Sequence, residues 1–211
     1  MFTFGSLVRS NLRYYFRTHL AVVAGVAVGV GVLTGALLVG DSVRGSLRDL
    51  FVSRLGRTDY TVSSSGFFRE ALAEEMFAGS APMVAFEGMV TNERTGLRRA
   101  GVQVYGVDGR FWTFHGAREP EMSPRGPLLT ASLETELEAV EGDSVLLRVE
   151  RPSEVSRGSL HGIKQDVGRT IRLTVLPGLA STGLPEFSIY PKQESVAAIF
   201  VPLARLQRDL D

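Results

Sequence analysis

The chain has 211 residues, with 23 basic and 23 acidic side chains and no cysteine. This length accommodates one membrane span and one folded domain of roughly 100–170 residues, and the lack of cysteine excludes disulfides, thiolate metal sites and a cysteine nucleophile. Residues 1–40 contain three arginines and no acidic residue, so the remainder is slightly acidic, which argues against nucleic-acid binding.

Residues 1–19 carry a row of arginines beside regularly spaced apolar side chains. Arg9, Arg13 and Arg17 follow one another at intervals of four, and apolar residues recur every three or four positions from Phe4 to Phe16. This spacing predicts an amphipathic helix at the membrane interface, with the arginines near anionic head groups of the lipid bilayer. A basic flank without defined structure is the alternative interpretation.

Residues 20–40 read LAVVAGVAVGVGVLTGALLVG and contain no charge. As a helix they would span roughly 30 Å, the thickness of the hydrocarbon core, so they predict one transmembrane helix. A buried core helix and a cleaved signal peptide are the alternatives. The run exceeds the usual signal-peptide apolar region of roughly 7–15 residues, and no clear A-x-A site precedes Asp41, which disfavours cleavage.

The flanking charges predict the orientation of this helix. Three arginines and His19 precede it, whereas the charges between Asp41 and Asp49 nearly cancel. Because positive residues resist translocation, the N-terminus is predicted to be cytoplasmic and residues 41–211 to be extracytoplasmic.

The span is also rich in glycine, which a lone anchor does not need. Gly25 and Gly29 form one G-x-x-x-G pair, and Gly31 and Gly35 form a second. Small residues four positions apart let another helix approach closely, so this helix is predicted to pack against partner helices.

Residues 41–57 keep helical spacing and predict a stalk that continues the membrane helix and ends near Gly56, a natural C-cap. Residues 58–211 mix strands and helices without strict alternation, which favours an α+β domain. Strands are predicted at 59–65, 82–92, 98–107, 127–130, 144–149, 169–176 and 195–201, and helices at 67–77, 131–140 and from Pro202 through Leu210. Residues 110–114 are predicted to be a short helical segment or a tight turn that buries aromatic side chains, and residues 152–168 to be a mobile loop. Thr130 and Ser132 are the N-cap candidates of the 131–140 helix, and Pro202 occupies the first turn of the last helix.

Three stretches of the domain carry a resemblance to a known family. They are Val104–Phe114 (VYGVDGRFWTF), Leu128–Leu147 with its EGDSVLL ending, and Ile199–Leu210 (IFVPLARLQRDL). Together with the order of basic helix, Gly/Val-rich span, stalk and exported domain, they resemble the N-terminal part of an FtsX-like or MacB-like ABC transporter permease, including its periplasmic core domain. The resemblance covers nearly all of the chain.

The resemblance implies a location in the bacterial cytoplasmic (inner) membrane, with residues 41–211 in the periplasm and residues 58–211 as the periplasmic core domain. It also implies an ABC ATP-binding subunit as partner, which would bind ATP, so that this chain itself holds no cofactor. Further partners would be other permease helices, in the same complex or in a homo- or heterodimer, and a periplasmic partner protein. Family permeases have additional membrane helices after this domain, so the sequence is expected to be a fragment that is incomplete at its C-terminus. The family couples ATPase-driven motion to the exported domain.

No catalytic or metal-binding pattern is visible. The sequence lacks a P-loop, a G-x-S-x-G elbow and an H-E-x-x-H motif, and its histidines (His19, His115 and His161) are predicted to be solvated or structural. The acidic residues Glu134, Glu136, Glu138, Glu141 and Asp143 are predicted to be a solvated helix face rather than a metal site, and Phe111, Trp112 and Phe114 to be core rather than a ligand platform. We therefore expect no enzyme. The alternatives to a permease segment are a single-span periplasmic binding or adaptor module and, weakest, a membrane-anchored enzyme.

Overall fold

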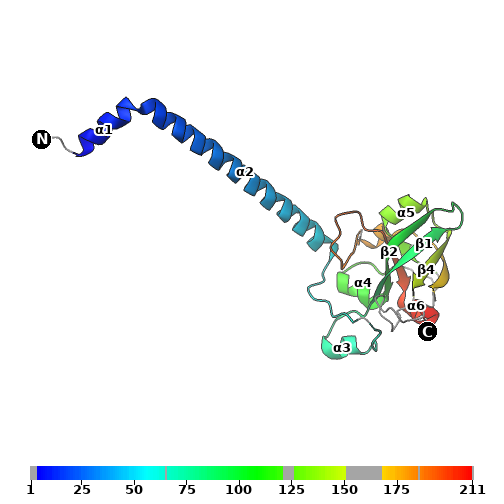
Figure 1. The fold of residues 1–211 in the computed structure, drawn as a ribbon. Coiled ribbons are helices and arrows are strands. Elements are labelled where there is room, and N and C mark those ends of the chain that lie inside the picture. The colour runs from blue at the N-terminus through cyan, green and yellow to red at the C-terminus, as the bar shows by residue number, and fades with distance from the viewer. Residues whose placement is uncertain (1–3, 65, 121–125, 151–167, 185, 211) are drawn as a thin grey trace, which may run out of the picture. The chain divides into compact units, whose positions relative to one another are not determined.

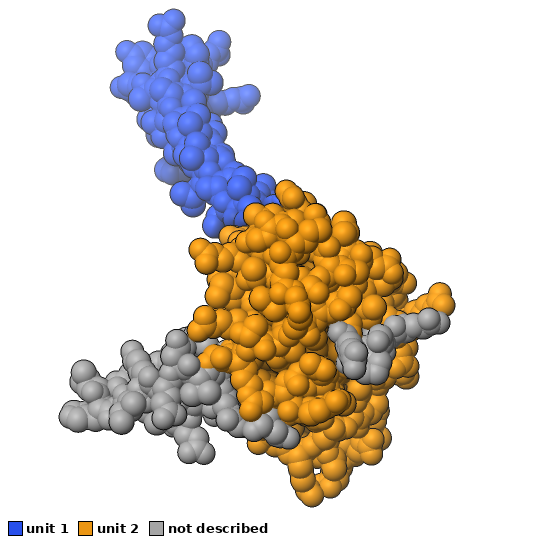
Figure 2. Space-filling model, turned by 90° about the vertical axis from the view of Figure 1, so that its right-hand side faces the viewer, with its two compact units in different colours: residues 1–50 blue, residues 51–211 orange. Residues whose placement is uncertain are grey.

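The computed structural model describes residues 4–64, 66–120, 126–150, 168–184 and 186–210. The chain divides into two compact units, residues 1–50 and residues 51–211, which Figure 2 shows in different colours.

The first unit consists of two helices that follow one another. Helix α1 spans Phe4–Tyr14 and helix α2 spans Phe16–Arg54, the last four residues of which belong to the second unit. Tyr15 separates them, yet its amide donates to the Asn11 carbonyl and its own carbonyl accepts from the His19 amide, so the backbone ladder continues across the bend. The helical conformation predicted for these segments and for the stalk is found.

Helix α2 is long and apolar enough to cross a membrane, by its length and composition, and its most apolar part is not buried in this chain. All residues from Phe16 to Leu50 are exposed. A core helix of a soluble domain would be buried, so that alternative does not fit α2. A signal sequence passes the same test of length and composition.

The second unit is built on a six-stranded sheet with the strand order β3-β6-β2-β1-β4-β5. The strands are β1 (Val84–Asn92), β2 (Arg98–Val107), β3 (Leu128–Leu129), β4 (Ser144–Glu150), β5 (Gly168–Thr174) and β6 (Ala198–Pro202). Strands β2 and β6 pair in parallel and the other neighbours are antiparallel. Figure 1 shows this sheet with helices of the same unit around it. The mixed sheet with helices confirms the predicted α+β class.

Alternation along the strands sends neighbouring side chains into two separate cores. Val104 of β2 and Ile199 of β6 belong to one core, whereas Tyr105 and Phe200, one residue further on, belong to the other. The first core is completed by helices α5 (Ala131–Leu137) and α6 (Leu203–Leu210). The second is completed by helix α4 (Gly109–His115) and the 3-10 turn η1 (Leu179–Thr182).

Some predicted element boundaries are wrong. Residues 59–64 form no strand, although their side chains alternate, because alternation alone supplies no backbone partner. The predicted helix at 67–77 is reduced to helix α3 (Leu72–Met76). Pro202 ends β6, paired with Val107 of β2, rather than opening a helix, and α6 begins one residue later.

Helix α5 also differs from its prediction at both ends. It stops at Leu137 because Glu138 adopts a left-handed conformation with φ 47°, whereas the prediction extended to Val140. Thr130 occupies the N-cap position, but its hydroxyl makes no capping bond and donates instead to the Val196 carbonyl at 2.6 Å. The predicted loop at 152–168 lies outside the described residues except for Gly168, which begins β5.

Candidate functional site

Arg54, the last residue of α2, is buried in the second unit and forms hydrogen bonds there. Its side chain is buried, its Nε atom donates to Glu186 Oε2 at 2.8 Å, and its Nη1 atom donates to the Lys192 carbonyl at 2.7 Å. Its own carbonyl accepts the amide hydrogen of Ser188 at 3.1 Å. A buried guanidinium needs such partners, since an unpaired charge away from water is costly. The end of α2 is thus tied at three points to the chain between η1 and β6.

A second contact follows immediately, where the chain leaves the helix. Gly56 adopts a left-handed φ of +59°, and the Arg57 amide then donates to His115 Nδ1 at 3.3 Å. A Cβ atom on Gly56 would lie 2.6 Å from that nitrogen. The glycine is therefore required both for the backbone conformation and for the close approach of His115.

His115 remains uncharged in this position. Burial is the main cause that lowers its pKa from 6.5 to about 4, and the nearby Arg57 charge lowers it further. The imidazole ring packs against Phe111 and Phe187, with ring centroids 4.5 and 5.0 Å away. His115 therefore accepts a hydrogen bond from the Arg57 amide and holds residue 57 next to α4. This is a structural role, one of the two roles predicted for this histidine.

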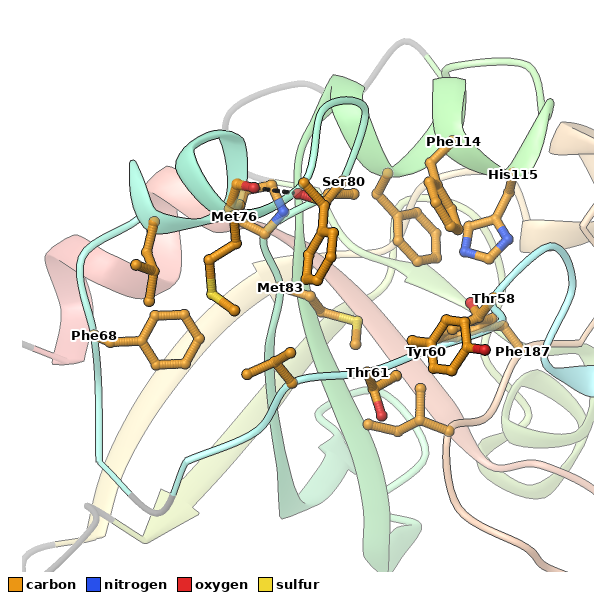
Figure 3. A pocket seen from close by; sticks show the side chains of 18 residues that line it. Thr58, Tyr60, Thr61, Phe68, Met76, Ser80, Met83, Phe114, His115 and Phe187 are labelled. Carbon is orange, nitrogen blue, oxygen red and sulfur yellow. Dashed lines mark hydrogen bonds between the residues drawn. The ribbon is translucent and has the colours of Figure 1, made fainter.

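The segment that follows, residues 58–64 and 66–83, is named the strap here. It forms one wall of a cavity of about 190 Å³ whose other wall comes from α4 and from the chain around Phe187. Figure 3 shows Met76 and Met83 of the strap, with Phe114 and His115 of α4, gathered around this space. A second cavity of about 300 Å³ lies between the strap, the start of β1 and α6.

The strap leaves many large apolar side chains in contact with solvent. Tyr60 is 92% exposed, Phe67 62% and Phe77 63%. Val62, Phe68 and Met76 are also exposed. Large apolar side chains that are exposed close together in one segment are typical of a surface that binds something.

Glu70 holds the strap in place through polar contacts. Its carboxylate forms an ion pair with Arg110 and accepts a hydrogen bond from Gln207 at 3.3 Å. Arg110 also pairs with Asp108, the N-cap of α4. The hydrogen bond from Arg110 is the main cause that lowers the Glu70 pKa.

The glycines and arginines singled out from the sequence lie on the first two helices. Gly25, Gly29, Gly31 and Gly35 are all exposed on α2, and a Cβ atom on any of them would meet no atom within 4 Å. Arg9 and Arg13 lie on α1 and Arg17 at the start of α2, all exposed. The structure places no described residue of this chain against the glycines.

Other predicted groups turn out to be structural in the described part of the chain. Glu136 pairs with Arg99, and Asp143 pairs with Arg94, so these acids do not gather into one cluster. No group of three or more potential metal ligands occurs among the described residues. Phe111 and Trp112 are buried core residues, as predicted, and Phe111 also lines the first cavity; Phe114 is only half-buried and lines the same cavity.

Sequence reasoning missed the cavity itself. The apolar residues at 67–77 were interpreted as one face of a longer helix, and Phe187 lies in a stretch without any periodic pattern. The density of aromatic and methionine residues between positions 60 and 83 is the clue that the sequence offers. Only the folded chain shows that these side chains surround a common space.

The described residues contain one helix that is long and apolar enough to cross a membrane, and an α+β unit that has an apolar cavity; these two features define the class of the protein. No protein-family model matches this sequence, and comparison with curated proteins gives no match.

Proposed function

We propose that this chain is the first membrane helix and the exported domain of an ABC transporter permease of the FtsX-like or MacB-like kind. In this proposal α2 crosses the bacterial cytoplasmic membrane with the N-terminus in the cytoplasm. The exported domain binds a substrate or a partner protein, and ATPase-driven motion in the membrane reaches it through α2. The resemblance of three sequence stretches, described above, supports the choice of family.

The observation that carries the proposal is the continuity of α2. It runs without interruption from Phe16 to Arg54, through the apolar segment and the stalk, and its last residue is buried and hydrogen-bonded in the second unit. A helix is a stiff element, so displacement along it is passed on rather than absorbed in a loop. The Arg54 contacts and the Arg57–His115 contact would receive that displacement.

The first two helices supply the proposed membrane contacts. Arg9, Arg13 and Arg17 have the charge that anionic head groups attract, and the apolar residues of α1 are exposed. The glycine pairs of α2 are free to receive partner helices, which would be other permease helices or a second subunit. ATP would be bound by a separate ATP-binding subunit.

A topology experiment tests the membrane part directly. The chain has no cysteine, so a single introduced cysteine can be labelled without background. We expect Ala78→Cys in intact spheroplasts to react with a membrane-impermeant maleimide, and Ser10→Cys to react only after the membrane is broken. The reverse pattern, or release of the chain from membranes at high pH, would contradict the proposal.

The second candidate function is a membrane-anchored binding or adaptor module without transport. The apolar cavity and the exposed strap support this adaptor function as much as they support the permease function. Both functions need the domain to bind a molecule or a partner, and these two features bear only on binding. Co-purification separates the two. A permease segment is expected to retain an ATP-binding subunit in mild detergent, whereas an adaptor module is expected to be isolated without one.

A further inference from the structure

The two cavities beside the strap adjoin each other. Both are lined by a common set of residues, which are Thr61, Val62, Phe68, Pro82, Met83 and Ile189. Their volumes are about 190 and 300 Å³, so together they fall within the range of about 300–1,000 Å³ that small-molecule sites occupy. The strap therefore lines two adjoining cavities: the first is lined mainly by apolar side chains, and the second also by Ser63, Ser64, Glu70 and Gln207.

The lining of this space is almost free of charge. No Asp, Glu, Lys or Arg is among the described residues that line the first cavity, and Glu70 is the single charged residue among those of the second. Glu70 is already engaged by Arg110 and Gln207. His115, at the first cavity, is neutral because its pKa is lowered to about 4. A charged ligand would lose its hydration here without gaining a partner.

The side chains around the space are also of a kind that adapts to apolar ligands. Met76 and Met83 have flexible thioethers that fill irregular gaps, and Phe68 and Phe114 offer ring faces. Figure 3 shows these side chains directed toward the same region from the strap and from α4. Phe68 and Met76 are exposed, so an apolar guest would remove both its own surface and theirs from water.

From these observations we infer that the space between the strap and the body of the domain binds a small, uncharged, apolar molecule. The inference deepens the proposed function by giving the chemical class of its ligand, and it rests on that function only for the biological setting. Docking of a protein segment on the strap is the competing occupant. It is disfavoured because the space is a cavity with walls on two sides rather than an open face.

The test uses the full chain in lipid nanodiscs and a photoactivatable alkyl diazirine that has no charged group. After illumination, labelled peptides are mapped by mass spectrometry. Labelling within residues 20–40 by probe dissolved in the bilayer serves as an internal reference. The same alkyl diazirine with a terminal carboxylate is the matched charged probe.

Two variants change the cavity lining, and each has a matched control variant. Ala73 lines the first cavity and Ala78 lines neither, so Ala73→Phe fills the space and Ala78→Phe is its control. Val62 lines both cavities and is exposed, so Val62→Asp introduces a charge with little risk to folding, and Val62→Leu is its control. The fluorescence of the sole tryptophan, buried Trp112, reports whether each variant is folded.

We expect the uncharged probe to label peptides of the strap and of α4. Labelling should fall about tenfold in Ala73→Phe and Val62→Asp, the change produced by losing about two buried methylene groups, and should persist in both controls. Equal labelling of Ala73→Phe and Ala78→Phe, or equal labelling of the strap by the carboxylate probe, would overturn the inference. Failure of the membrane anchoring that the proposed function requires looks different: residues 20–40 would go unlabelled while the strap is labelled.

Discussion

The Nε atom of Arg54 donates a hydrogen bond to Glu186 Oε2 at 2.8 Å, although the two residues lie 132 positions apart in the sequence. The same guanidinium reaches the Lys192 carbonyl at 2.7 Å. Because hydrogen bonds that involve a charged group contribute more than neutral ones, this residue should matter for the stability of the second unit.

Replacement of Arg54 by alanine should lower the free energy of unfolding of the second unit by about 2 kcal/mol, since the Lys192 carbonyl and the Glu186 carboxylate lose their donor. Thermal unfolding followed by Trp112 fluorescence measures this, because the tryptophan is buried in that unit. Arg48→Ala, an exposed arginine of the same helix, is the control and should have little effect. Equal unfolding temperatures for the two variants would refute the role of Arg54.

The neutral state of His115 gives the domain a pH dependence with a defined sign. Its pKa is lowered from 6.5 to about 4 in the folded chain, mainly by burial. Above pH 6.5 the group is neutral in both states. As the pH falls from 6.5 towards 4 the unfolded chain takes up a proton that the folded chain does not, so stability should decline, and below that range this decline should stop.

The pH effect is tested by measuring the unfolding temperature between pH 7.5 and pH 4 for the parent chain and for His115→Gln. The variant cannot gain an imidazolium charge, so its curve should be flatter in that interval. Parallel curves would show that another group controls the acid response.

Gly56→Ala should destabilise the domain for two separable reasons. The left-handed φ of +59° costs a residue with a Cβ about 1–2 kcal/mol, and the new Cβ would approach His115 Nδ1 to 2.6 Å. Gly96→Ala is the matched control, because Gly96 has φ +72° with no atom within 4 Å of its Cβ position. Chemical denaturation should therefore show a larger loss for Gly56→Ala than for Gly96→Ala. An equal loss would mean that His115 moves away without cost.

Asn92 is a buried polar residue that binds three groups around the β1–β2 turn. Its Nδ2 atom donates to the Leu137 carbonyl and to Asp143 Oδ2, both at 3.1 Å, and its Oδ1 atom accepts from the Arg94 amide at 2.9 Å. Asn92→Asp removes both donors and sets a second carboxylate beside Asp143. We expect a loss of about 3 kcal/mol in unfolding free energy.

Acidification provides a check on the Asn92→Asp prediction. Protonation of one of the two adjacent carboxylates restores a donor, so part of the lost stability should return as the pH is lowered. The control is Asn11→Asp, the same chemical change at an exposed position of α1. A variant as stable as this control at neutral pH would contradict the role of Asn92.

Gly25→Ile and Gly29→Ile should weaken assembly with partner helices without disturbing the chain itself. Neither position has an atom within 4 Å of its Cβ, so the added side chains meet no obstacle in the described structure. Insertion, measured by resistance to extraction at high pH, should be unchanged, whereas co-purification of partner subunits should decrease. Undiminished co-purification would count against packing through this face.

Much of the secondary structure could be predicted because its signals are local. The strands at 84–92 and 98–107 are joined by a turn with Gly96 at positive φ, and α4 has an aspartate N-cap and a glycine C-cap. The strap could not be predicted in the same way. Its side chains alternate over 59–64, but none of the six strands pairs with it.

The sequence by itself determined where an apolar helix of membrane-spanning length lies and that an α+β unit follows it, because helix period, strand alternation and the charge of flanking residues are properties of neighbouring positions. Only the tertiary structure decided that Arg54 pairs with Glu186, that His115 accepts the Arg57 amide, and that strap, α4 and Phe187 surround one apolar space. Those contacts join residues that are distant in the chain. Which of these distant residues meet is decided by how the whole sheet and its two cores pack.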